Sequence, residues 1–241
     1  MKLAKPDCLL LGETWGDAWR LVSPGRLDSA MNYLFRDAAR DWLTLSKLGA
    51  SGFADRANRL LALYPYEVSL RMYDPLDSHD TPRFITLCGG DIGKYRLAVA
   101  LQMCFPGCPA VYYGDELGME GGEDPDCRRP MRWDDVEDNP TRAHYQKLAR
   151  LRAQLPALRT GRFRSHVALE NGLYAFRRET DTQQLLCVVN TGLEPVSVRL
   201  ELPGGMAGMA AVHDHYSGRS LAVADGGVHI SLKVGEGLIL E

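Results

Sequence analysis

The sequence predicts an α/β fold over residues 1–158, followed by an all-β sandwich over residues 159–241. In the first part, short apolar runs alternate with longer amphipathic segments, which is typical of parallel strands joined by helical crossovers. In the second part, short alternating runs are separated by Gly, Asn and Pro, which is typical of antiparallel sheets. The pattern changes between Leu158 and Gly161, where we place the boundary.

Four short runs in the first part are expected to be strands. Each is largely apolar, and the first ends at Gly12 and Glu13 after a run that we expect to be buried. In chain order, the expected strands cover residues 7–13, 27–35, 69–76 and 110–113.

Four segments in the same part are expected to be helices, because their apolar residues recur at helical spacing or because capping residues bound them. Asp91 and Asn139 are the expected N-caps of the last two, and Pro140 occupies the first turn of the fourth. The first begins near residue 37 and ends before residue 49, and the others cover residues 53–64, 91–105 and 139–155.

The second part contains five runs that alternate apolar and polar residues or are uniformly apolar. Turn-forming sequences such as Glu170-Asn171-Gly172 separate them, which favours hairpins over helices. The expected strands cover residues 173–176, 185–189, 196–202, 228–232 and 237–240.

Composition excludes several classes of partner and location. Of the 241 residues, 24 % are charged and the net charge is −3, so there is no basic excess to attract nucleic acid or an anionic membrane surface. No run is long enough to span a bilayer. The apolar run at residues 8–11 is too short, and too closely flanked by Asp7 and Glu13, for a signal peptide. We therefore expect a cytoplasmic protein.

The six cysteines are scattered and form no C-x-x-C pair. Such a distribution favours reduced, mostly buried thiols over a metal site. No D-x-D-x-D-G loop for calcium is present either, so we expect no metal and no cofactor.

Polar side chains follow three of the four expected strands. Glu13 ends the first, His79 and Asp80 follow the third, and Asp115 and Glu116 follow the fourth. The carboxyl ends of parallel strands meet at one edge of a sheet or barrel. Carboxylates gathered there suit glycoside hydrolysis, although carboxylates at strand ends also cap helices and anchor loops. Spacing alone leaves both interpretations open.

Four blocks of the sequence, in chain order, resemble the α-amylase family of glycoside hydrolases. The last of them resembles the cyclomaltodextrinase, neopullulanase and maltogenic amylase subgroup. The blocks are residues 12–15 (GETW), 76–83 (LDSHDTPR), 109–116 (PAVYYGDE) and 121–133 (GGEDPDCRRPMRW). The resemblance implies strands five to eight of a TIM (β/α)8 barrel before the sandwich. It also implies retaining hydrolysis of α-1,4-glucosidic bonds in maltodextrins, cyclomaltodextrins or pullulan.

The resemblance also assigns roles to individual residues. Glu13 corresponds to the general acid/base, and Asp80 to the carboxylate that stabilises the oxocarbenium-like transition state. His79 would hydrogen-bond the same sugar, although a buried structural histidine is the alternative. Asp115 and Glu116 are better interpreted as anchors of the loop after the last barrel strand.

Three more residues receive substrate-binding roles from the resemblance. Trp15 would stack on the leaving-group side of the cleaved bond, unless it belongs to the core. Asp124 and Arg128 would reach the non-reducing end of the glucan, unless they pair with each other to brace a Gly-rich loop.

The family's nucleophile is the feature that these blocks lack. It is an aspartate that lies two residues after an arginine and follows the fourth barrel strand, and no such pair precedes Glu13. We therefore expect the chain alone to be inactive, and a homo-oligomer or an association with the missing N-terminal half. The alternative is a non-catalytic remnant that binds glucan weakly or not at all.

Overall fold

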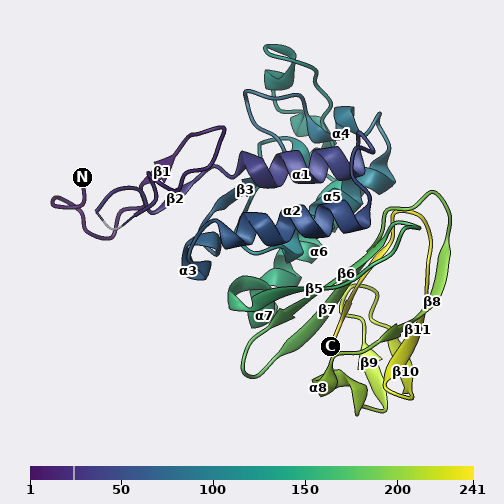
Figure 1. Ribbon diagram of the computed structural model, residues 1–241. Helices are drawn as coiled ribbons and strands as arrows, with labels where there is room; N and C mark the ends of the chain where they lie inside the picture. Colours follow the sequence, from purple (N-terminus) through teal and green to yellow (C-terminus); the bar gives the residue numbers. More distant parts are fainter. Residues whose placement is uncertain (24) are drawn as a thin grey trace.

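The structure, a computed structural model, describes residues 1–23 and 25–241. Its first part contains four short parallel strands. β1 (Leu11–Gly12) pairs with β2 (Ser29–Ala30), and β3 (Tyr73–Pro75) pairs with β4 (Cys108–Ala110). A parallel bridge from Met31 to Tyr73 connects the two pairs. The carboxyl ends of all four strands therefore lie on the same side (Figure 1).

These strands are shorter than the sequence predicts, and the expectation that residues 7–13 form a buried strand is wrong. Leu9 is 67 % exposed and Leu11 40 % exposed. Among the described residues β1 has a strand neighbour on one side only, so pairing does not extend along the whole apolar run.

Capping and turn residues displace the other predicted strand boundaries. The run at 27–35 is a strand only at its centre, because Asn32 accepts a hydrogen bond from the Phe35 amide and starts a helix. The run at 69–76 begins inside a short helix, so only its last part is a strand. The strand expected at 110–113 lies two to three residues earlier, at Cys108–Ala110.

Eight α-helices are present in the described residues. The caps predicted at Asp91 and Asn139 are confirmed, since each side chain accepts two backbone N–H groups of the following turn. The helix predicted to begin near residue 37 begins at Tyr33. The helices are α1 (Tyr33–Leu43), α2 (Ala50–Ala62), α3 (Tyr66–Ser69), α4 (Phe84–Leu87), α5 (Ile92–Cys104), α6 (Pro140–Gln154), α7 (Pro156–Thr160) and α8 (Gly204–Ala207). The longest of them has 15 residues, and none combines the length and the hydropathy of a membrane span.

The second part of the chain forms two four-stranded antiparallel sheets. The first has the order β12-β7-β6-β5 and the second the order β8-β11-β10-β9. Their strands are β5 (Arg162–Ala168), β6 (Leu173–Glu179), β7 (Gln184–Asn190), β8 (Val196–Glu201), β9 (Ala211–His213), β10 (Ser220–Ala224), β11 (Gly227–Leu232) and β12 (Gly237–Leu240). All five predicted strands are present, whereas β5, β9 and β10 lack a sufficiently apolar pattern and were not predicted.

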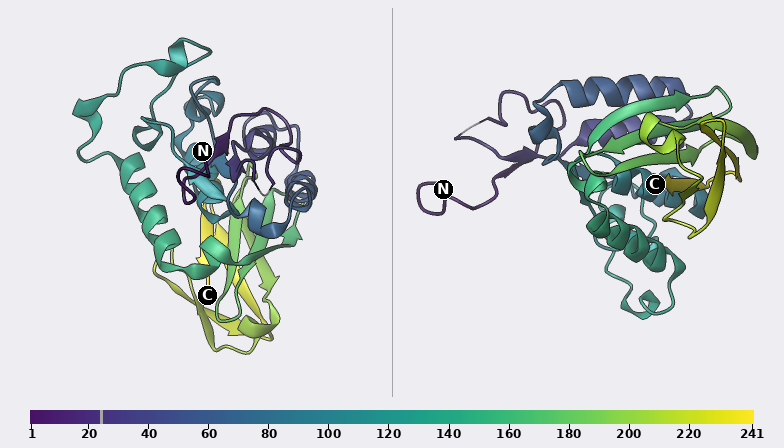
Figure 2. Two further views of the ribbon diagram at one scale, coloured as in Figure 1. Left: turned by 90° about the vertical axis from the view of Figure 1, so that its left-hand side faces the viewer. Right: turned by 90° about the horizontal axis from the view of Figure 1, so that it is seen from below.

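Two of the three apolar clusters in the described residues give the molecule its layers. One lies between the two antiparallel sheets and includes Leu186 and Ile230. The other lies between the helices and the outer face of the first sheet, where Trp42 and Phe53 pack against Tyr174 of β6. Figure 2 shows the resulting order of helices, sheet and sheet, with the segment that carries β1 and β2 projecting to one side.

Candidate active site

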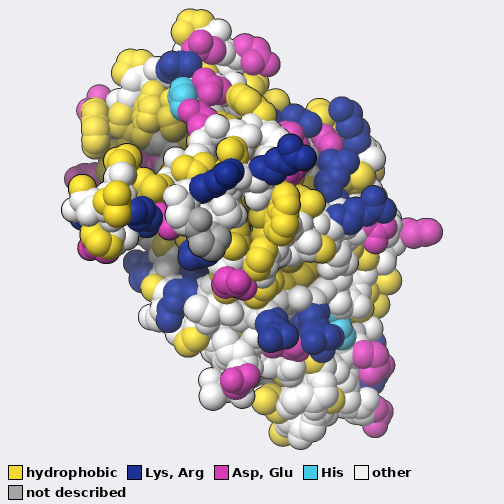
Figure 3. Space-filling model, turned by 60° about the vertical axis from the view of Figure 1, so that its left-hand side comes forward, with side chains coloured by type: hydrophobic (Ala, Val, Ile, Leu, Met, Phe, Trp, Pro, Cys, Tyr) yellow, Lys and Arg dark blue, Asp and Glu magenta, His cyan; other side chains and the backbone are white. Residues whose placement is uncertain are grey.

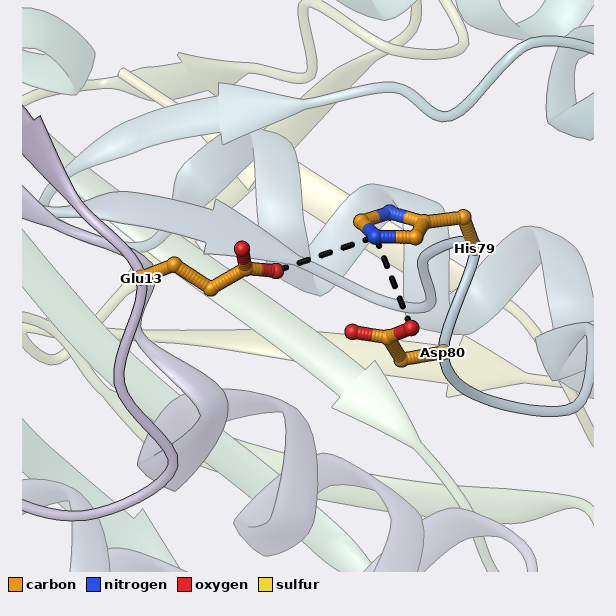
Figure 4. A group of neighbouring side chains, drawn as sticks. All are labelled: Glu13, His79 and Asp80. Atoms are coloured by element: carbon orange, nitrogen blue, oxygen red, sulfur yellow. Dashed lines mark ion pairs between the residues drawn. The ribbon is translucent and has the colours of Figure 1, made fainter.

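Glu13, His79 and Asp80 converge at the carboxyl edge of the parallel strands (Figure 4). Glu13 directly follows β1, whereas the other two lie in the loop after β3. His79 Nε2 lies 3.4 Å from Asp80 Oδ1 and 3.9 Å from Glu13 Oε1. Parallel pairing brings together residues that are more than sixty positions apart in the sequence, as predicted from the strand ends.

All three side chains face solvent. The exposed fractions are 52 % for the Glu13 side chain, 45 % for His79 and 33 % for Asp80. The alternative of a buried structural histidine is therefore wrong. The same three side chains offer donor atoms within 4.8 Å of one another, a set that a divalent cation could also use. Arg128 already lies 3.4 Å from Asp80 Oδ1 and supplies a positive charge there.

A hollow of about 390 Å³ lies beside this group. Glu13 and His79 are in its wall, together with residues of β1, β3 and the segment after β4. Its volume is within the range of pockets that bind small ligands. The group therefore has both acidic side chains and adjacent space for part of a sugar chain.

Arg128 fastens the loop at residues 121–128 to the loop that carries His79. Its Nε donates to the His79 carbonyl oxygen at 2.9 Å and lies 2.8 Å from Asp124 Oδ1. Cys127 Sγ contacts the same carbonyl oxygen at 3.2 Å. The alternative in which Asp124 and Arg128 pair with each other is thus observed, but Arg128 also reaches Asp80.

Arg83 connects the loop at residues 121–128 to the segment after β4 from the protein interior. This side chain is 1 % exposed, and its Nε donates to the Cys127 carbonyl oxygen at 2.9 Å while its Nη1 pairs with Asp115 Oδ1 at 2.9 Å. The guanidinium also lies over the Tyr112 ring, 4.0 Å from its centroid. A planar group with five donors suits this arrangement, because one side chain bonds a carboxylate and a carbonyl at once.

Asp77 and Asp115 form a buried acidic pair beside Arg83. Burial raises the pKa of Asp115 well above its usual range, and the neighbouring Asp77 raises it further. Burial also raises the pKa of Asp77, whose Oδ2 accepts the Phe84 amide at 2.6 Å. Burial of the two carboxylates beside each other therefore disfavours their ionisation, most strongly for Asp115.

Trp15 lies at the rim of the site and not in the core. It is 55 % exposed, and one face of its ring stacks on Tyr33 with centroids 4.2 Å apart and planes at 16°. The Tyr33 hydroxyl in turn hydrogen-bonds Ser78 Oγ at 2.8 Å. About half of Trp15 remains exposed to solvent beside this stack.

Sequence reasoning missed Tyr33 and Arg83. Tyr33 reaches Ser78, and Arg83 reaches Asp115, so each acts through a partner more than thirty residues away. The blocks that resemble the family contain Arg83 but give no sign that it is buried. The interpretation of Glu116 as a loop anchor agrees with the structure, since its Oε2 accepts the Gly114 amide at 2.8 Å.

An arginine and an aspartate two residues apart occur twice after Glu13, at Arg26 and Asp28 and at Arg132 and Asp134. Asp28 does not join the site, because its carboxylate accepts the Leu10 amide and pairs with Lys2 at 2.8 Å. It is therefore a structural anchor of the N-terminal segment.

Comparison with known proteins identifies relatives of this arrangement. A family model described as the catalytic domain of α-amylase matches residues 1–152, which is more than half of the chain. Neopullulanase 2 of Thermoactinomyces vulgaris is 39 % identical over 244 residues, which cover 100 % of this chain and 41 % of the relative. A cyclomaltodextrinase from a Bacillus species is 40 % identical over 79 % of this chain and 34 % of its own length.

The structure gives the same result. A solved cyclomaltodextrinase superposes with a TM-score of 0.92 at 33 % identity, covering 100 % of this chain and 41 % of that one. The chain thus spans less than half the length of these relatives. The TIM-barrel family fold with mixed helix and strand content follows from these matches. The resemblance found in the four sequence blocks is confirmed, and the chain belongs to the α-amylase family.

Proposed function

We propose that this chain supplies the acid/base half of a retaining glycosidase that cleaves α-1,4-glucosidic bonds in maltodextrins, cyclomaltodextrins or pullulan. The observation that carries the proposal is the convergence of Glu13, His79 and Asp80 on an open, solvent-facing edge. The relatives named neopullulanase and cyclomaltodextrinase support this substrate class.

The proposed chemistry assigns one task to each side chain. Glu13 protonates the glycosidic oxygen as the bond breaks, and Trp15 stacks on the departing sugar. Asp80 and His79 hold hydroxyls of the sugar that develops positive charge, so the negative charge of Asp80 stabilises the transition state. Retention of configuration also needs a nucleophilic carboxylate on the other face of that sugar, which a residue outside these four must supply.

The architecture proposed for this chemistry divides the chain in two. We propose that residues 1–158 are the second half of a catalytic (β/α)8 barrel, with β1 to β4 as strands five to eight. Residues 159–241 would form the C-terminal sandwich. The continuous parallel order of β1 to β4 and the apolar core shared by the two antiparallel sheets support this division.

Asp124 and Arg128 are the proposed contacts to the non-reducing end of the glucan. Both side chains are about half exposed, and their mutual ion pair orients the guanidinium beside Asp80. We also propose a cytoplasmic location, supported by six cysteines that are all free in the structure.

Activity assays on the isolated chain, and on a hybrid that restores a complete barrel, test the proposed function directly. The 241-residue chain is expected to show no hydrolysis of cyclomaltodextrin, because no counterpart of the family's nucleophilic aspartate precedes Glu13 in this sequence. A hybrid that adds the part of neopullulanase 2 preceding the matched region is expected to hydrolyse it, as measured by reducing-sugar release. If the isolated chain hydrolyses the substrate and Glu13→Gln abolishes this activity, the chain supplies its own nucleophile and the expectation is wrong. A folded but inactive hybrid would refute the proposed role of the trio.

Self-association is a second expectation for the isolated chain. Five large apolar side chains between residues 9 and 21 are 40 % or more exposed, and Figure 3 shows apolar side chains on the face that brings this segment forward. Such a cluster is rare on a monomer, so we propose a homo-oligomer or an association with the rest of the barrel. Light scattering after gel filtration is expected to give a dimer or larger. The five exposed apolar side chains between residues 9 and 21 are Leu9, Leu11, Trp15, Trp19 and Leu21. A monomer at low micromolar concentration would contradict the expected association.

A further inference from the structure

A second cavity lies away from the proposed active site, between the helices and the first antiparallel sheet. It has a volume of about 330 Å³ and is walled by α5, α6, β7 and β12. Most of the wall is apolar, and Ser217 and Arg219 contribute exposed residues to it. Two cysteines, Cys104 and Cys187, belong to this same wall.

These two cysteines come from opposite sides of the cavity. Cys104 is the last residue of α5, and Cys187 lies in β7, which pairs with β6 and β12 on its two sides. They are 4 % and 2 % exposed, and both are free thiols. Both side chains belong to the same apolar cluster, and both line the same cavity. The fold therefore places two thiols in one cavity wall at the boundary between the helices and the sheet.

Two guanidinium groups surround Cys104. Arg178 Nη1 donates to the Cys104 carbonyl oxygen. Arg152 Nη1 donates to the carbonyl oxygens of the neighbouring residues, Met103 at 2.7 Å and Phe105 at 3.2 Å. These bonds fix the backbone around Cys104 and place two positive charges near its sulfur, and such charges favour a thiolate.

The two thiols differ in acidity. The pKa of Cys104 is lowered, first by the hydrogen bond from Cys187 and then by Arg152 and Arg178, in spite of burial. The pKa of Cys187 is raised, first because its thiol donates that bond and then by burial. Cys88 provides a contrast, since burial raises its pKa to about 12. Cys104 is therefore suited to act as the nucleophile and Cys187 as its partner.

We propose that Cys104 and Cys187 form an oxidisable dithiol site, which a hydroperoxide entering the cavity converts into a disulfide that joins α5 to β7. The Cys104 thiolate attacks one oxygen of hydrogen peroxide, forming a sulfenic acid and releasing hydroxide. The Cys187 thiol then attacks the sulfenic sulfur, and water leaves. In sum, two thiols are oxidised to one disulfide, and one peroxide is reduced to two waters.

The consequence of this step is a covalent link between the two layers of the molecule. α5 packs among the helices, and β7 is an inner strand of the first antiparallel sheet. Oxidation would prevent the two layers from separating, and a thiol reductant would restore their independence. The site is distinct from the proposed catalytic trio and does not depend on the proposed function.

The test uses the 241-residue chain treated with hydrogen peroxide, quenched with N-ethylmaleimide and digested without reduction. Mass spectrometry is expected to find the peptides of Cys104 and Cys187 linked, and thiol titration to find two of the six thiols lost first. The same oxidised chain is expected to melt at a higher temperature, and dithiothreitol is expected to reverse this shift.

Variants identify the reacting sulfurs. Cys104→Ser and Cys187→Ser are each expected to slow thiol loss at least about tenfold, because either change removes one half of the pair. Cys88→Ser, which changes another buried and free cysteine, is expected to react like the unmodified chain. A linkage of Cys104 to Cys108, or oxidation of Cys104 without any linkage, would overturn the proposal. The peptide map of the unmodified chain decides this even where a serine variant folds poorly.

Discussion

Replacing Glu13 with Gln in the hybrid barrel is expected to lower kcat/KM for cyclomaltodextrin by about 10³-fold. The amide has nearly the volume of the carboxyl group but has no proton of comparable acidity to give to the departing oxygen. The loss is expected to be far smaller on an activated aryl maltoside, whose leaving group needs little protonation. Initial rates on the two substrates, measured side by side, give the comparison.

Glu123→Gln is the matched control for this prediction. Glu123 is an exposed glutamate in the loop that also carries Asp124 and Arg128, and its carboxylate makes no hydrogen bond or ion pair within the described residues. Its substitution is expected to leave both rates unchanged. Equal losses on the two substrates in Glu13→Gln would show that the residue positions the site and does not transfer a proton.

Replacing Arg83 with Ala is expected to lower the free energy of unfolding by about 3–5 kcal/mol. The change removes the single guanidinium paired with Asp115 and leaves the Cys127 carbonyl oxygen without its donor, both in a region closed to water. Urea unfolding followed by circular dichroism measures the loss. Arg83→Lys keeps the charge but not the planar guanidinium. Its free energy of unfolding is expected to lie between those of the unmodified chain and the alanine variant, and it can be measured even if the alanine variant does not fold.

Arg129→Ala is the control for the stability prediction. Arg129 also pairs with an aspartate, Asp126 at 2.7 Å, but both side chains are about half exposed. Water and salt replace most of such an interaction, so little change in the unfolding midpoint is expected. An Arg83→Ala variant as stable as Arg129→Ala would show that the buried pair stabilises neither loop.

The sequence predicts those features that depend on neighbours along the chain. The caps Asp91 and Asn139 act within one helical turn, so their side chains and the helices that follow could be predicted. The extent of the strands could not, because residues 7–13 form a strand only where β2 lies beside them. Strand pairing is a tertiary property that an apolar run alone does not determine.

The same distinction holds for the site. Glu13, His79 and Asp80 were predicted to meet because strand ends in a parallel sheet share an edge, and the geometry agrees. The supports beneath them could not be predicted. Arg83 depends on Asp115, and Tyr33 on Ser78, and these partners become neighbours only when the chain has folded.

The two sides of the trio are held with unequal firmness. The loop of His79 and Asp80 is hydrogen-bonded to the segment at 121–128, which in turn accepts a hydrogen bond from the buried Arg83. Glu13 follows a strand of two residues with a single neighbour among the described strands, and its side chain is half exposed. Amide hydrogens near Asp77 should therefore exchange slowly with solvent, and those near Glu13 rapidly. If a sugar binds between them as proposed, it meets one rigid wall and must order the other. The conformational entropy lost on ordering that side would weaken binding to this chain alone.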